Sequence, residues 1–124
     1  MKKISLLCFA FLIANLPAIA YYEKDYQTAW CIANEGKTEV ILPDKTRVDC
    51  VTRTHAIEFD FAKKWGESIG QSLYYASILE KTPGIVLIIE NPEKDLKYLK
   101  RLETVANKYN IKIWTITPDF LVKN

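Results

Sequence analysis

Several features that often reveal function are scarce in this chain. It has a single histidine in 124 residues, and only one cysteine, Cys50, stands within ten residues of His55, which leaves too few ligands for a zinc site. We interpret His55 as a turn residue at the start of a strand. No low-complexity run or internal repeat occurs. The function must therefore be sought in the spacing of other polar residues.

The first 20 residues have the composition of a secretory signal peptide. Lys2 and Lys3 precede an apolar stretch over residues 4–19, and the small residues that end at Ala20 form an A-x-A cleavage site. The stretch is too short, and too abruptly followed by polar residues, to favour a membrane span; an uncleaved anchor is the alternative. We therefore expect residues 1–20 to be removed from a periplasmic or secreted protein.

The mature chain is short, and its side-chain charges balance. Removal of residues 1–20 leaves 104 residues, which fits one domain, residues 21–124, with one core. Two lysines leave with the signal peptide, so the 17 basic residues fall to 15 and equal the 15 acidic ones. The overall charge therefore gives no indication of nucleic acid, and any electropositive groove would have to be local.

Hydrophobic periodicity and turn residues predict an α/β fold. The expected order is helix, three strands, helix, strand, helix and strand, with Pro118 ending the regular structure. These elements are expected at residues 23–34, 38–42, 46–52, 56–61, 62–79, 85–89, 93–109 and 111–115. The continuous apolar run of residues 85–89 indicates a buried, parallel central strand.

Acidic residues converge in the two strands before the second helix. Because side chains alternate along a strand, Glu58 and Asp60 project together, while their apolar neighbours point into a core. Asp49, on the preceding strand, supplies a third carboxylate if the turn at residues 52–54 closes a hairpin. Asp44 is set aside because it lies at a hairpin tip. Three converging carboxylates suggest a hard divalent cation.

This order of motifs resembles the PD-(D/E)XK nuclease superfamily, whose members carry an acid on one strand, Glu-x-Lys on the next, and then a helix. Asp49 matches the first acid and Glu58 the second, and the run from Gln71 to Tyr75 matches the Gln-x-x-x-Tyr motif of a large branch. The resemblance spans most of the mature chain. It implies a restriction-endonuclease-like core, helix-three strands-helix-strand, with an added helix and strand and a mixed sheet.

The chain departs from the family at Asp60, which stands in the position of the lysine. Lys63 and Lys64 follow early in the next helix. Helical geometry brings Lys64 to the same flank as Gln71, whereas Lys63 points elsewhere, so we take Lys64 as the relocated catalytic lysine. Asp60 then becomes a third metal ligand, or alternatively a cap on the positive end of the helix.

The resemblance implies phosphodiester hydrolysis assisted by magnesium or manganese. Asp49 and Glu58 would hold the ion, and Lys64 would stabilise charge on the phosphate. By the same resemblance, Gln71 positions backbone or nucleobase groups and Tyr75 supports it. Glu23 is a further candidate acid near the metal, although a first-turn glutamate is also favoured by the helix dipole alone.

Two functions remain open. The first is an exported, metal-dependent nuclease that acts on DNA or RNA, either alone or as a homodimer. The second is an exported module that kept the nuclease fold, lost catalysis with the lysine, and binds nucleic acid or a protein. Asp60 favours the second function. The joint presence of Asp49, Glu58, Gln71 and Tyr75 favours the first.

Export leaves two cysteines, Cys31 on the first helix and Cys50 on a strand. An oxidising compartment permits a disulfide if the helix packs over that strand. Two separate buried thiols are the alternative that we favour, because free cysteine is a common core residue and the sequence does not fix the distance between the two. A bridge would lie on the face of the strand away from Asp49.

Overall fold

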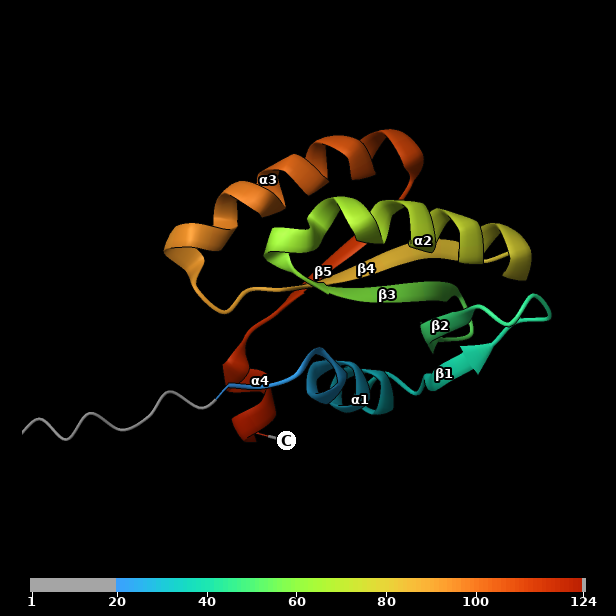
Figure 1. The fold of residues 1–124 in the computed structure, drawn as a ribbon, viewed down its shortest axis with the longest axis horizontal. Coiled ribbons are helices and arrows are strands. Elements are labelled where there is room, and N and C mark those ends of the chain that lie inside the picture. The colour runs from blue at the N-terminus through green and yellow to red at the C-terminus, as the bar shows by residue number, and fades with distance from the viewer. Residues whose placement is uncertain (1–19, 124) are drawn as a thin grey trace, which may run out of the picture.

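The computed structural model describes residues 20–123, which form a five-stranded sheet covered by helices on both faces (Figure 1). The strands are β1 (Lys37–Ile41), β2 (Arg47–Val51), β3 (His55–Phe61), β4 (Thr82–Ile88) and β5 (Lys112–Ile116). The helices are α1 (Glu23–Ala33), α2 (Trp65–Leu79), α3 (Pro92–Tyr109) and α4 (Pro118–Lys123), and the 3-10 turn η1 (Ala62–Lys64) leads into α2.

The sheet is mixed, and its strands follow the order of the chain, β1-β2-β3-β4-β5. β1, β2 and β3 pair antiparallel, whereas β3, β4 and β5 pair parallel. The parallel pairs are joined by α2 and α3, which lie together on one face, while α1 and α4 lie on the other (Figure 1). The α/β class and the mixed sheet that the sequence predicts are therefore confirmed.

β4 is the strand around which the core is built. Its side chains from Ile85 to Ile88 have at most trace exposure, because helices cover both faces of the sheet at this point. Val86 and Ile88 pack beneath α1, and Ile85 and Leu87 pack beneath α2 and α3. The prediction of a buried parallel strand is correct, although β4 begins at Thr82 rather than at residue 85.

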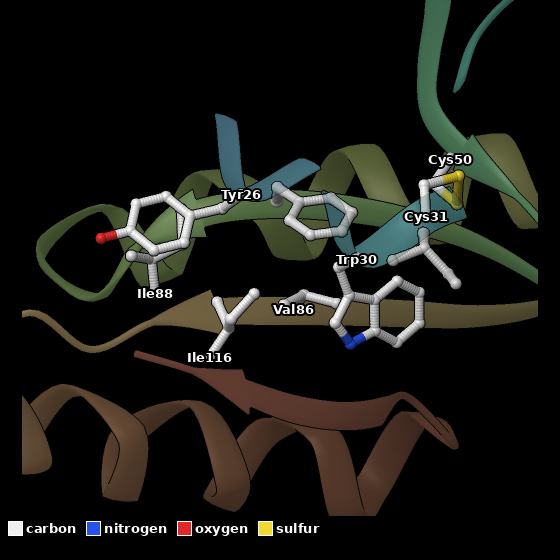
Figure 2. Packing of buried hydrophobic residues seen from close by; sticks show 9 residues of the cluster. Tyr26, Trp30, Cys31, Cys50, Val86, Ile88 and Ile116 are labelled. Carbon is white, nitrogen blue, oxygen red and sulfur yellow. A yellow bond between two sulfur atoms is a disulfide. The ribbon is translucent and has the colours of Figure 1, made fainter. Parts of the chain in front are cut away.

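A disulfide joins α1 to β2. Cys31 and Cys50 have Cα atoms 5.9 Å apart and their sulfurs are bonded, and the bridge lies at the Trp30 end of the cluster in Figure 2, away from Tyr26. The expectation of two separate thiols is wrong, because α1 packs directly over the end of β2 that carries Cys50. Gly36 makes room for the bridge: a Cβ at this position would lie 2.6 Å from both sulfurs.

Two further comparisons with the sequence prediction concern the ends of the chain. Regular structure does not stop at Pro118, because this proline occupies the first turn of α4, where its missing N–H is no loss. The predicted signal peptide lies outside the described residues except for Ala20. Within residues 20–123, no helix is long and apolar enough to span a membrane.

Candidate functional site

The edge of the sheet is distorted at Asp49. The pairing of β1 with β2 runs in regular register but omits the position where Asp49 would face Glu39, and Glu39 has a left-handed backbone with φ of 55°. Val48 packs on the α2 side and Cys50 on the α1 side, although residues two apart in a regular strand share a face. The distortion therefore turns Asp49 out of the regular alternation of its strand.

A buried side chain of α1 holds this distortion. Gln27 is 3% exposed, and its amide donates hydrogen bonds to the backbone carbonyl of Asp49 at 2.9 Å and to the Glu39 carboxylate at 3.1 Å. Burial of a glutamine is favourable only when its polar atoms are satisfied, so these two bonds explain why Gln27 can lie beneath the strands. The backbone around Asp49 is fixed as a result.

β2 and β3 separate at the same place. Their register pairs Cys50 with Ile57 and stops there. Beyond this pair, the N–H of Asp49 donates to the Glu58 carboxyl at 3.3 Å, and the Asp49 carboxyl accepts from the N–H of Phe59 at 2.9 Å. Side chains thus replace the strand ladder, and the two carboxyls are held in the gap between the strands.

A cavity of about 330 Å³ opens beside these two carboxyls. Six of the predicted site residues line it: Glu23, Asp49, Glu58, Asp60, Lys64 and Gln71. They come from α1, β2, β3, η1 and α2, so the fold brings together segments that are far apart in the sequence. Lys63 does not line this cavity, in agreement with the predicted helical geometry.

The four carboxyls form two hydrogen-bonded pairs. Asp49 bonds with Glu58, and Glu23 bonds with Asp60. Burial, reinforced by the Asp49 charge, raises the pKa of Glu58 to about 9, and burial, with Glu23 and Glu67 nearby, raises the pKa of Asp60 to about 7. Burial also raises the pKa of both Asp49 and Glu23. At neutral pH the pairs therefore retain protons that they would lose in water.

Positive charge in the cavity is limited. Lys64 is exposed at its rim and lowers the pKa of both Glu23 and Asp60, which places its ammonium within electrostatic reach of that pair. Arg47 also lines the cavity, but its guanidinium is 2.6 Å from the Glu39 carboxylate and is engaged there. The cluster is therefore deficient in cations, and protons compensate.

Gln71 and Tyr75 occupy different environments. Gln71 is exposed on α2 and lines the cavity. Tyr75 is 6% exposed and packs with Val48 in the core, where the nearby charges of Glu58 and Asp49 raise its pKa in addition to burial. Tyr75 thus lies in the core within electrostatic reach of both acids but does not line the cavity, and its supporting role stays a prediction.

Sequence reasoning missed two charged lining residues, Arg47 and Glu67. Both had a detectable pattern. Arg47 lies two residues before Asp49 on the same strand, and Glu67 lies three residues after Lys64 and four before Gln71, which places it on their flank of the helix. Glu67 adds a fifth acid to the cavity and contributes to the raised pKa of Asp60.

The chemistry of the donors suits a hard cation. The acidic side chains of the cavity offer carboxylate oxygens, the ligands that magnesium and manganese prefer. A cation could replace the protons that the two carboxyl pairs share. Within residues 20–123, no group of three or more histidine, cysteine or acidic side chains is already arranged to hold an ion. A bound ion would therefore require carboxyls to turn from each other towards it.

No protein-family model, curated protein or solved structure matches this chain.

Proposed function

We propose that this protein is an exported, metal-dependent nuclease with a restriction-endonuclease-like core. The observation that supports this proposal most directly is that one cavity is lined by Asp49, Glu58 and Gln71, which match motif positions of the PD-(D/E)XK nucleases, together with Asp60 and Lys64. The element order from α1 to β4 and the separation of β2 from β3 at the acids agree with such a core.

Asp49, Glu58 and Asp60 would hold magnesium or manganese. When bound, the ion supplies a Lewis acid that makes a bound water easier to deprotonate and offsets charge on phosphate oxygens. Lys64, at the exposed rim, would contact the scissile phosphate and stabilise negative charge as it develops. Gln71, exposed on the same flank of α2, would position the nucleic-acid strand. Tyr75 would keep water away from Asp49 and Glu58 on the core side.

A second function is favoured by two observations. No ligating group of three is already in place among residues 20–123, and Asp60 replaces the lysine of the family. An exported module that binds nucleic acid or a protein without cleaving it would need neither. In such a module, the carboxyl pairs that retain protons would serve as a hydrogen-bonded part of the structure.

One titration separates the two functions. Purified residues 21–124 are titrated with magnesium and with manganese in the presence of labelled single- and double-stranded DNA and RNA. A nuclease cleaves at least one substrate only when metal is present, and Glu58→Gln abolishes that cleavage. Binding of nucleic acid without cleavage at any metal concentration would support the second function, and Glu103→Gln, an exposed acid on α3, serves as the matched control.

A further inference from the structure

A second, larger hollow lies at the opposite end of β3. It has a volume of about 410 Å³, within the range of small-molecule sites, and it shares no lining residue with the carboxyl cavity. Its walls come from the end of α1, the turn between β2 and β3, and β5. It mixes indole rings with polar and charged side chains at the rim.

Three rings form the aromatic wall of this hollow. The rings of Trp30 and Trp114 have centroids 5.2 Å apart and are inclined at 61°, and His55 meets Trp114 at 5.2 Å and 72°. Gly84 of β4 lets the Trp114 indole lie close to the sheet, since a Cβ at Gly84 would come within 2.7 Å of the ring. Because the Trp114 indole lies close against β4, space for the hollow remains on its other side.

The turn that forms another wall is held in one conformation. The Lys81 ammonium donates to the backbone carbonyls of Thr52 and Arg53 at 2.9 and 2.8 Å, and the Thr52 hydroxyl accepts from the N–H of His55 at 3.0 Å. A ligand would therefore meet a preorganised turn and would not have to order it. The exposed Arg53 side chain is carried on this turn.

Opposite charges stand on separate segments of the rim. Arg53 lies on the turn, and Glu35 follows the last turn of α1. Glu35 has a left-handed φ of 57°, a conformation that glycine or asparagine adopts more readily than glutamate. Burial, together with the Lys112 charge, lowers the pKa of His55 and so favours its uncharged ring.

These features select among ligand classes. A cation is disfavoured, because Arg53 lines the hollow and the Lys112 ammonium lies 5.8 Å from the Trp114 ring. A purely apolar ligand would leave Arg53 and Glu35 without partners. A flat aromatic ring can pack against indoles, an anionic group suits arginine, and a carboxylate accepts hydrogen bonds from ring or exocyclic N–H groups. Nucleotides combine all three properties.

We propose that this hollow binds a nucleoside monophosphate unit, with the base against Trp114 and Trp30, the phosphate on Arg53 and the N–H edge of the base on Glu35. A base with both ring and exocyclic N–H donors, such as guanine, is expected to bind most tightly. The site is separate from the carboxyl cavity, and the proposal does not depend on nuclease activity. The unit is either a free nucleotide or the end of a strand, and these two sources can be distinguished.

The test follows tryptophan fluorescence of residues 21–124 during titration with GMP, guanosine and UMP in EDTA. Saturable quenching by GMP is expected, with weaker binding of guanosine and UMP. Arg53→Gln should weaken GMP binding about tenfold and leave guanosine binding unchanged, whereas Arg101→Gln, an exposed arginine on α3, should change neither. Trp65→Phe, on the far side of the sheet, should retain the quenching.

Glu35 provides a variant that separates binding from folding. Glu35→Gly should keep or raise the melting temperature, because glycine suits the left-handed position, yet it should weaken GMP binding. Absence of saturable quenching in the wild type, equal GMP affinity in Arg53→Gln and wild type, or loss of GMP binding in a folded Glu58→Gln variant would each overturn the proposal. The last result would place the nucleotide in the carboxyl cavity.

The source of the nucleotide is decided with a short 5′-phosphorylated oligonucleotide in EDTA. Tighter binding than that of GMP, again weakened by Arg53→Gln, would support the end of a strand as the ligand. Equal or weaker binding of the oligonucleotide would support a free nucleotide. Binding of the oligonucleotide with no response to Arg53→Gln would count against the assigned phosphate contact.

Discussion

The backbone N–H of Asp49 donates to the Glu58 carboxyl at 3.3 Å, while the Asp49 carboxyl accepts from the N–H of the residue after Glu58. Each strand is therefore held by the acid of the other at the point where the backbone ladder ends. One consequence is that a neutral acceptor at residue 58 preserves this link, because an amide oxygen can accept the same N–H. Charge and strand pairing can thus be separated by mutation.

Glu58→Gln is expected to leave the metal-free fold within about 1 kcal/mol of the wild type at neutral pH, because the Glu58 carboxyl already holds its proton there and an amide is its uncharged counterpart. It should also abolish stabilisation by metal. At a magnesium concentration about 100 times the dissociation constant, a single site would stabilise the wild type by about 2.7 kcal/mol. Scanning calorimetry with and without magnesium measures both effects. Equal metal-induced shifts in the two proteins would remove Glu58 from the site.

Lys64→Ala is expected to reduce turnover by roughly tenfold to a hundredfold with little change in metal affinity, because its ammonium would act on the reacting phosphate. Lys63→Ala is the matched control, since Lys63 lies next to it in η1 but does not line the cavity. Single-turnover cleavage at saturating metal measures the effect. The reverse result, a large loss in Lys63→Ala alone, would transfer the role to Lys63.

Stability without metal is expected to fall as the pH rises from about 5 to 9. Burial and Asp49 raise the pKa of Glu58 from an ordinary value near 4.5 to about 9, so the folded protein binds a proton that the unfolded chain releases. That contribution is complete below the ordinary pKa and is lost as the pH passes through about 9. Asp60 adds a loss around pH 7. Thermal melts in EDTA should show the decline, at about 4–8 °C per kcal/mol lost, and Glu58→Gln should flatten it.

Gly36→Ala is expected to destabilise the protein much more while the disulfide is present than after its removal. The added Cβ would meet both sulfurs at 2.6 Å, and cysteine-to-alanine changes remove those atoms. Cys31→Ala/Cys50→Ala alone should cost about 3 kcal/mol, as the loss of a bridge across 19 positions predicts in the chain-entropy model. Denaturant melts of the three variants form a double-mutant cycle. A cost of Gly36→Ala that is the same with and without the bridge would refute this explanation.

The regular elements could be predicted because local patterns determine them. The sequence shows alternating apolar residues in β3, an apolar run in β4 and helical spacing of apolar residues in α2. These patterns mark which side chains are buried, and they do not depend on which element packs against them. The sequence does not predict α4. A proline commonly ends regular structure, but it is also favoured in the first turn of a helix, as at Pro118. Local rules gave two answers at Pro118, and tertiary packing decided between them.

Most residues of the candidate site could be predicted from the sequence, but the backbone geometry that brings them together could not. The strand and helix periods place Asp49, Glu58, Asp60, Lys64 and Gln71 on compatible faces, and the structure brings them to one cavity. The left-handed backbone of Glu39 has no sequence indicator, because glutamate rarely adopts it. The disulfide and the hollow between Trp30 and Trp114 depend on contacts between distant segments, which no local pattern encodes.

The bridge from Cys31 to Cys50 joins the helix that carries Glu23 to the strand that carries Asp49. The Asp49 charge raises the proton affinity of Glu23, so as the pH rises the growing repulsion between them pushes α1 away from the sheet. Packing alone would yield to that force by letting the helix loosen. A covalent link cannot stretch in this way. The bridge therefore acts as a mechanical restraint that keeps the charges of Glu23 and Asp49 close together.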